Sequence, residues 1–587
     1  MTNYLDNELI YKSFMLGAKN VIQEKNGLNA INVFPVPDGD TGSNLASIMQ
    51  SIIERSKLGK TSEETLQSIA DAAIVGARGN SGIIFAQYIY GFSLEVENEV
   101  SKETFAEMLK RASNYAYQSI AKPVEGTMIT VMRAFAHAVE TLKEKGNDFL
   151  DILSSAYDMV KIELAKTPEL LAVLKENKVV DAGAKGFVHF IQGFVKALKG
   201  EELDIAPQET IDHIHVDHLE DSQYRYCTEA LLRGSHFNLE SIRSTLSNDG
   251  DSLVVAGSDK TVRIHIHSDH PDIVFEKLSK IGTLSEQKVD DMRRQFEAAN
   301  HPKYKIALVT DSIADLPESF VDEHQIHQMP LNLHMEDTIY YDKVTIKSER
   351  FYQMMDELTN YPTSSQPNQK QLENFFSFLT TYYDEIIVIT VSEEMSGTYR
   401  AFVDASEKFK DKKIRVINSK QNSGAEGLLV MKAQELIQQG LSVDEIVQKM
   451  DHYIKKSKIY VSVKTLKYMV KNGRVSKVTG VIGKITNLKP VISIDENGKG
   501  IISDKGLSLK SSDQKIYQHV KEAMERSGIE KYAIVHAKGG KRVDEYVEKY
   551  TKLIGRAPDY VMDISTIVAM NAGLGTIAVS YIEGDQS

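Results

Sequence analysis

Two aspartates at two-residue spacing, Asp38 and Asp40, lie in the segment NVFPVPDGDTGSN, residues 32–44. An extended backbone directs both carboxylates to the same side, and Gly39 between them permits a tight turn. Magnesium prefers a few carboxylate or carbonyl oxygens and leaves its other positions to water and phosphate oxygens. Both aspartates and the Asn32 amide could therefore hold Mg²⁺. On this fragment alone, a turn that caps a helix is the simpler interpretation.

The next residues could open a helix and offer N–H groups and hydroxyls to phosphates: Thr41, Gly42, Ser43 and Asn44. Three further motifs follow: GARGNSG (76–82), EGTM (125–128) and VDAGAKG (180–186). Phosphoryl transfer depends on positioning and charge neutralisation, so a kinase needs no nucleophile motif. The P-loop and protein-kinase motifs, which mark the commonest ATP sites, are absent from the sequence.

In this order on a helical domain, the four motifs resemble the L-type ATP-binding domain of the dihydroxyacetone kinases. They resemble more closely its relative in bacterial fatty acid kinase. The resemblance implies that Asp38 and Asp40 are catalytic magnesium ligands, with Asn32 third, where dihydroxyacetone kinases have another aspartate. It implies an ATP site with Ser43, Asn44, Ser81 and Gly82 at the phosphates, Thr127, Met128, Asp181 and Gly183 near the nucleoside, and Thr41, Gly42, Gly79 and Asn80 completing the set.

A second group of candidate ligands is Cys227 with the pair His265 and His267 in RIHIHSDHP. Histidines two apart on a strand face the same side, and a thiolate would complete a set that zinc accepts. Alternatively, a lone cysteine is a small core residue and the histidines face solvent. The YCTE…HIH arrangement resembles the middle domain of fatty acid kinase, which implies a structural zinc ion bound by these three residues.

The last part of the chain contains hydroxyls and glycines in strand-to-helix loops. Its motifs are VTDSIADLP (309–317), PTSSQPN (362–368), EEMSGTY (393–399), KNGRVS (471–476) and NLKPVI (487–492). Hydroxyls of Thr363 or Ser364 and of Ser396 can hydrogen-bond a carboxylate, and Ser396 and Gly397 also offer backbone N–H groups. Individually, each motif could be a helix cap or turn.

Taken together, these five motifs resemble a complete DegV-like domain, a family that binds fatty acids and presents them to fatty acid kinase. The resemblance implies a fatty acid as ligand. The family usually has a histidine in an H-x-G-P-G segment near the carboxylate, whereas this chain has Asn571 in NAGLG. Asparagine can donate a hydrogen bond but cannot be cationic.

Four segments of the chain are expected to position these residues. Residues 1–200 show helical periodicity throughout, as in the helix that begins with Thr61 and Glu64 of a capping box. An acidic linker is expected at 201–218. Residues 219–302 indicate a small α+β domain, with EALLRG taken as helical. Residues 303–587 repeat short apolar runs followed by helices, which predicts an α/β domain with a parallel sheet.

Composition limits the classes of partner. The 587 residues carry a net charge of −13, which disfavours nucleic acid as a partner. The single cysteine excludes an intrachain disulfide, and neither a signal peptide nor a long apolar span is visible. The sequence therefore predicts a cytoplasmic, multidomain protein, with a homodimer as the default assembly.

The combined interpretation is a kinase fused to its own lipid-binding domain, which converts ATP and a protein-bound fatty acid to acyl phosphate. Separate DegV-like binding proteins and membrane enzymes that use acyl phosphate are the further partners it implies. One alternative is a kinase for dihydroxyacetone (glycerone) or another polyol. The other is a non-enzymatic, nucleotide-responsive protein that binds fatty acid.

Overall fold

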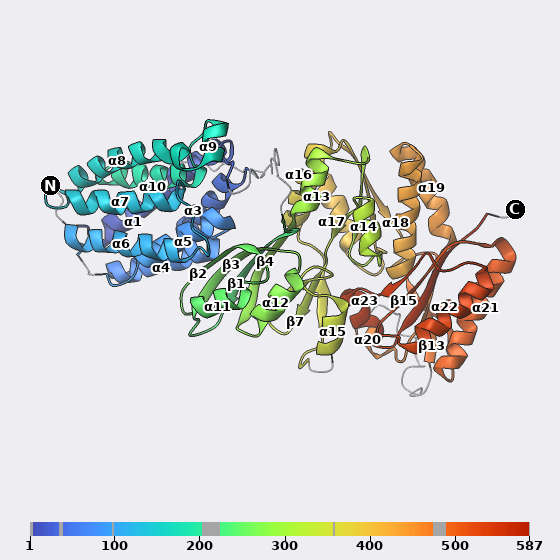
Figure 1. The fold of residues 1–587 in the computed structure, drawn as a ribbon. Helices are drawn as coiled ribbons and strands as arrows, with labels where there is room; N and C mark the ends of the chain where they lie inside the picture. Colours follow the sequence, from blue (N-terminus) through green and yellow to red (C-terminus); the bar gives the residue numbers. More distant parts are fainter. Residues whose placement is uncertain are drawn as a thin grey trace. The chain divides into compact units, whose positions relative to one another are not determined.

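The computed structural model describes residues 4–34, 39–96, 99–201, 223–355, 358–472 and 489–585. The chain divides into two compact units, unit 1 (Met1–Ala299) and unit 2 (Asn300–Ser587) (Figure 1). The structure confirms the expected multidomain class, with a helical N-terminal region and a C-terminal α/β region. None of the described helices has the length and apolar character needed to cross a membrane.

The first part of unit 1 is helical, as predicted for residues 1–200. Its helices are α1 (Asn7–Gln23), α2 (Lys25–Asn29), α3 (Thr41–Arg55), α4 (Ser62–Gly76), α5 (Gly79–Phe92), α6 (Lys102–Gln118), α7 (Met128–Leu142), α8 (Phe149–Leu170), α9 (Ala172–Asn177) and α10 (Ala182–Leu198). Of the expected linker 201–218, all but Glu201 lies outside the described residues.

Local sequence determines where these helices begin, and an apolar core holds them together. Thr61 begins α4 because its side chain accepts from the Glu64 N–H. Helix α10 packs against α1, α3, α7 and α8 and is buried along most of its length, as expected of a central helix. Around it, the rings of Phe14, Phe85 and Phe190 pack edge to face.

The rest of unit 1 is a four-stranded antiparallel sheet in the order β2-β3-β1-β4. Its elements are β1 (Tyr226–Arg233), α11 (Leu239–Leu246), β2 (Asp251–Gly257), β3 (Thr261–Ser268), α12 (Pro271–Ser279), β4 (Thr283–Asp291) and α13 (Met292–Asn300). The helical interpretation of EALLRG was wrong, because most of it lies in β1. Its apolar run packs within a sheet, and a short apolar run does not distinguish strand from buried helix.

Alternation along these strands gives the sheet two buried faces. Leu232 and Ile264 point to the core shared with α11 and α12, whereas Leu231, Val254 and Ala256 join the core of the helical part. On that second face α4 and α5 pack against β2 and β3. The sheet and the helices therefore form one compact unit.

Unit 2 contains a four-stranded parallel sheet in the order β11-β10-β5-β6, which confirms the predicted parallel sheet. Its elements are β5 (Ile306–Asp311), α14 (Glu318–Glu323), β6 (His327–Met329), α16 (Gln369–Tyr382), β10 (Glu385–Thr390), α17 (Thr398–Ser406), β11 (Lys413–Asn418), α18 (Ser423–Gln438) and α19 (Val443–Lys456). A small antiparallel sheet and a helix also lie in this part of the chain: β7 (Asn332–Met335), β8 (Thr338–Tyr341), α15 (Ser348–Met354) and β9 (Thr363–Ser365).

A second large sheet has the order β14-β13-β12-β17-β15-β16. Its elements are β12 (Ser457–Ser462), α20 (Lys467–Lys471), β13 (Lys489–Ile494), β14 (Gly500–Gly506), α21 (Leu509–Ser527), β15 (Ile529–His536), α22 (Lys541–Ile554), β16 (Tyr560–Asp563), α23 (Thr566–Ala572) and β17 (Ile577–Glu583). The runs KIYVSVK and YAIVHA, expected in the parallel sheet, form β12 and β15 here and pair antiparallel with β17. Helix α18 contacts strands of both large sheets.

Candidate functional site

The first two motifs of the helical part lie at two helix N-termini that touch. Helix α3 begins at Thr41 and α5 at Gly79, and the Thr41 and Ser81 hydroxyl oxygens are 3.4 Å apart. Gly79 has φ +57°, and a Cβ there would lie 2.1 Å from Nδ2 of Asn44. Only glycine fits this close approach, and helix N-termini favour anions.

The candidate magnesium ligands lie just before α3. Asp40 is the N-cap residue, but its carboxylate makes no cap hydrogen bond. The Thr41 hydroxyl donates to Oδ1 of buried Asn32. Asp38 lies outside the described residues. The structure therefore brings Asn32 beside the start of α3, where Asp40 also lies.

Two residues of the predicted ATP site differ in their surroundings. The Ser43 N–H donates to Oδ1 of Asn29 at 3.0 Å, and the Ser43 hydroxyl accepts from Nδ2 of the same residue at 3.0 Å. Asn29 therefore engages both groups that were expected to face phosphate. Among the described residues, by contrast, Oδ1 of Asn80 is buried without a hydrogen-bond partner, and it can still accept from a ligand.

The third and fourth motifs lie at the N-termini of α7 and α10. Thr127 is the N-cap residue of α7, and a Cβ on Gly183 would lie 3.1 Å from Cε of Met128. Asp181 caps α10 by accepting from the Ala184 N–H at 2.7 Å. Burial raises the pKa of Asp181 to about 7.

One contact joins the two pairs of helix N-termini. A Cβ on Gly186, in the second turn of α10, would lie 2.3 Å from Cδ1 of Leu45, in the second turn of α3. The starts of α3, α5, α7 and α10 therefore lie at one end of the helical part. Such an end provides the N–H groups and positive dipole ends that a polyphosphate requires.

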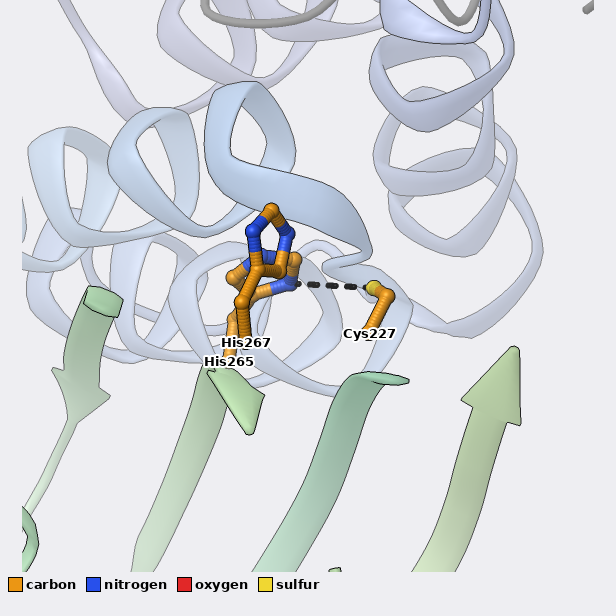
Figure 2. Close-up of side chains that lie close together, drawn as sticks. All are labelled: Cys227, His265 and His267. Carbon is orange, nitrogen blue, oxygen red and sulfur yellow. Dashed lines mark hydrogen bonds between the residues drawn. The ribbon is translucent and has the colours of Figure 1, made fainter. Parts of the chain in front are cut away.

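Cys227, His265 and His267 lie on the sheet face that packs against the helical part (Figure 2). Cys227 is opposite His267 across the β1–β3 pair, and one potential ligand atom from each residue lies within 4.8 Å of the others. Of the atoms that the structure describes, Nε2 of His265 is buried without a hydrogen-bond partner. This donor set and spacing fit a zinc ion.

The cluster is electrostatically suited to a cation. Burial, followed by the charge of Glu229, raises the pKa of the Cys227 thiol well above its usual value. A bound cation would reverse this effect, because it favours the thiolate. Burial lowers the pKa of His267, which keeps its imidazole neutral and able to ligate a metal.

Unit 2 contains a cavity of about 460 Å³ beside the loops that follow β5, β10 and β11. Its walls are apolar over much of their extent and include Ile313, Leu331, Val461, Met469, Ile492, Ile567 and Val568. Polar residues gather in the lining: Ser364, Ser365, Gln366, Glu393, Glu394, Ser396, Asn422, Ser423 and Asn571. An elongated amphiphile with a polar head is the kind of ligand that such a lining suits.

The structure brings most of the predicted lipid-site residues together at this cavity. Ser364, Ser396, Gly397 and Asn571 line it, whereas Thr363 does not. The Asn571 amide is engaged, since Nδ2 donates to the Ile567 carbonyl and Oδ1 accepts from Asn472, both at 2.8 Å.

Two features of the cavity bear on its ligand. Within the part of the lining that the structure describes there is no lysine, arginine or histidine. Most of the motif KNGRVS and the start of NLKPVI lie outside the described residues. The described lining therefore offers hydrogen bonds, and not a positive charge, to a carboxylate.

Three family models match successive segments of this chain. A DAK2 domain model matches residues 35–196, and a model of the middle domain of fatty acid kinase-like proteins matches 223–299. A model described as an uncharacterised protein of the DegV family matches 305–584. The chain joins a DAK2 domain, a fatty acid kinase-like middle domain and a DegV domain. The four helix N-termini belong to the DAK2 domain, the Cys-His-His cluster to the middle domain and the cavity to the DegV domain.

Related proteins match part of the chain. An uncharacterized protein of Staphylococcus epidermidis is 35% identical over 346 residues, which are 54% of this chain and 63% of the relative. One from Staphylococcus aureus is 35% identical over 312 residues, which are 50% and 57% of the two chains. The chain thus spans less than two thirds of the length of these curated relatives.

Solved structures of DegV proteins match about half of the chain. The Bacillus subtilis DegV, described as a fatty acid binding protein, is 25% identical with a TM-score of 0.45, and the match covers 48% of this chain and all of that one. A fatty acid binding DegV family protein from Streptococcus agalactiae is 23% identical with the same TM-score, over 48% of this chain and all of that one.

Sequence reasoning missed two residues of the middle domain that contact the DAK2 domain. Glu229 accepts from the Gly79 N–H at 2.7 Å, and the Arg263 guanidinium donates to the Ala77 carbonyl at 2.6 Å. The signal was present, because Glu229 follows Cys227 by two positions, the spacing that places both on one strand face. The helical interpretation of EALLRG concealed it.

Proposed function

We propose that this chain phosphorylates the carboxylate of a fatty acid with Mg²⁺ and ATP and releases ADP and acyl phosphate. The matched DAK2 and middle domains support kinase activity in general. The observation that carries the proposal is the gathering of four motif-bearing helix N-termini in a chain that also has a large, mainly apolar cavity with polar residues in its lining. The first suits ATP and the second suits a fatty acid.

The proposed chemistry needs few groups. A carboxylate oxygen of the fatty acid bonds to the γ-phosphorus as the bond to the bridging oxygen breaks and ADP leaves. The acceptor is already ionised, so no general base is required. Asp40, with Asp38 and Asn32, would hold magnesium, which neutralises phosphate charge when bound. Other backbone N–H groups at the starts of α3 and α5 would orient the phosphates, since those of Ser43 and Gly79 already bond to Asn29 and Glu229.

The lipid head is proposed to bind at Ser364 and Ser396, whose hydroxyls can donate to a carboxylate. Asn571 stands where the DegV family usually has histidine, and its amide is already hydrogen-bonded. This observation favours a second candidate, in which the DegV domain holds fatty acid as a sensor and a separate DegV-like protein presents the substrate. The apolar cavity wall disfavours a polyol substrate.

We also propose that Cys227, His265 and His267 bind zinc in the middle domain. The grouping of the three ligand atoms and the unpartnered His265 nitrogen among the described residues support this. The proposed partners are a fatty acid, separate DegV-like proteins, membrane enzymes that use acyl phosphate, and a second copy of the chain.

The test incubates the purified chain with Mg²⁺, ATP and oleate and traps acyl phosphate with hydroxylamine as the hydroxamate, detected by mass spectrometry. The expected result is hydroxamate from the wild type and a loss of about a hundredfold or more in Asp40→Asn, because the magnesium ion that neutralises the phosphates loses a carboxylate ligand. Product only after a DegV-like protein is added would favour the sensor hypothesis. No product in either case would refute the kinase.

A further inference from the structure

We infer that Glu229 is a positioning residue that ties the Cys-His-His cluster of the middle domain to the phosphate-binding loop of the DAK2 domain. The inference rests on the proposed function, because it assigns phosphate binding to the loop at Gly79. Glu229 was assigned neither to the predicted ATP site nor to the predicted zinc site.

The register of the sheet places Glu229 next to the Cys-His-His cluster on the same face. Glu229 is directly opposite His265, and Cys227 is directly opposite His267, on the pair β1–β3. These four side chains therefore share one face of the sheet. Oε1 of Glu229 lies 3.5 Å from Nδ1 of His265, and the Glu229 residue is only 2% exposed.

The same carboxylate oxygen reaches the nucleotide loop. Oε1 of Glu229 accepts from the Gly79 N–H at 2.7 Å, at the first residue of α5. That hydrogen bond holds Gly79 in its left-handed conformation against Asn44 of the first motif. One oxygen atom thus contacts a candidate metal ligand on one side and a candidate phosphate loop on the other.

A second residue of the same strand face anchors the loop two positions earlier. Arg263, which is 2% exposed, donates from Nε to the Ala77 carbonyl at 2.6 Å. The backbone at residues 77 and 79 is therefore fixed by the middle domain as well as by its own helices. Displacing β1 or β3 would move the loop with them, because both bonds are buried and short.

This arrangement makes a specific coupling possible. A metal-bound histidine commonly donates its other ring N–H to a carboxylate, and this bond fixes the ring and raises its basicity. Nδ1 of His265 lies 3.5 Å from Oε1 of Glu229 and 3.9 Å from Sγ of Cys227, while among the described residues its Nε2 has no partner. With Nε2 on the metal, Nδ1 can donate to Glu229. A cation on the cluster would fix His265 and hence Glu229 and Gly79. By linkage, zinc and nucleotide should then strengthen each other's binding.

The test measures Mg·ADP affinity by calorimetry on the full chain, with zinc bound and after chelation. For the wild type we expect chelation to weaken Mg·ADP binding about tenfold. In Glu229→Ala the effect of chelation should fall below about twofold, because the shared carboxylate is gone. Glu229→Gln keeps an oxygen for the Gly79 N–H but loses the charge at His265. It should retain nucleotide affinity and lose zinc affinity by about tenfold.

Asp251→Asn is the matched control. Oδ1 of Asp251 lies 3.6 Å from Nδ1 of His267, so this carboxylate neighbours the cluster at its other histidine. The variant should weaken zinc binding but preserve the coupling to Mg·ADP.

Each outcome has a distinct meaning. Equal effects of chelation in the wild type and Glu229→Ala, or unchanged zinc affinity in Glu229→Gln, would overturn the role of Glu229 alone. Absence of Mg·ADP binding by the wild type would overturn the proposed nucleotide site and this inference with it. Circular dichroism checks the fold of Glu229→Ala. If Glu229→Ala does not fold, the zinc affinity of Glu229→Gln, which keeps the buried volume, tests the role of Glu229.

Discussion

Replacing Asp181 by asparagine should remove a pH dependence from the stability of unit 1. Asp181 caps α10, is 5% exposed and accepts from the Ala184 N–H at 2.7 Å. Burial raises the pKa of its carboxyl from 3.8 to about 7, although hydrogen bonds from the Ala184 and Met128 N–H groups oppose the rise. The folded chain therefore binds this proton more tightly than the unfolded chain does.

The direction and size of the effect follow from linkage. The raised pKa contributes stability that is complete below the unfolded value, near pH 4, and is lost as the pH rises through about 7. A shift of about three units corresponds to about 4 kcal/mol at 1.36 kcal/mol per unit. An asparagine at this position would still accept the Ala184 N–H but could not ionise. Between about pH 4 and pH 8, the free energy of unfolding of Asp181→Asn should therefore rise relative to that of the wild type, by up to about 4 kcal/mol.

Urea unfolding of the full chain, followed by far-ultraviolet circular dichroism at several pH values, measures this difference. The control is Asp148→Asn, since Asp148 caps α8 by the same kind of bond, to the Asp151 N–H at 3.0 Å, in an exposed setting. This variant makes the same chemical change at an exposed cap. A difference between Asp181→Asn and the wild type that does not vary with pH would refute the claim that burial of the Asp181 carboxyl dominates.

Two further predictions concern the nucleotide loop and the cavity. Gly79→Ala puts a Cβ 2.1 Å from Nδ2 of Asn44 at φ +57°, so calorimetry should show at least about tenfold weaker Mg·ADP binding. The control is Gly200→Ala, at φ +76° with nothing within 4 Å of the added Cβ, which should bind Mg·ADP normally. Equal affinities in both variants would argue against nucleotide binding at the Gly79 loop. Val568→Phe crowds the cavity and should weaken oleate binding about tenfold in a fluorescence displacement assay. The control is Ile339→Phe, which lies outside the lining at a position 46% exposed and should leave oleate affinity unchanged. Undiminished oleate affinity in Val568→Phe would show that the lipid binds elsewhere.

The sequence predicted the site motifs better than it predicted how distant strands pair. The four motifs of the DAK2 domain fall at helix N-termini, where glycine, aspartate and hydroxyl side chains have local reasons to occur. The contact between Thr41 and Ser81 depends on tertiary packing. The order of the motifs indicated that they form one site, but it did not predict which of their side chains touch. Ser43 was assigned to phosphate because nothing local revealed its bonds to Asn29.

The strands of unit 2 show why the sequence did not predict how the strands pair. The runs that form β5, β10, β12 and β15 are alike in length and apolar character, yet β5 and β10 pair in parallel while β12 and β15 pair antiparallel with β17. A short apolar run can pair in either direction, so the pattern does not specify direction. Glu229 was concealed for a related reason, since its role depends on the register between β1 and β3.

The position of β17 has a consequence for how unit 2 is made. It lies between β12 and β15 in the six-stranded sheet, yet it follows both of them in the chain. The 120 positions from Ser457 to Ile577 take roughly 6 to 24 s to synthesise at 5–20 residues per second. During that interval β12, and later β15 once it has been made, each present a bare edge to other nascent chains. A premature stop codon between positions 563 and 577 would leave two half-sheets without the strand that joins them, so translation errors late in the message should also damage unit 2.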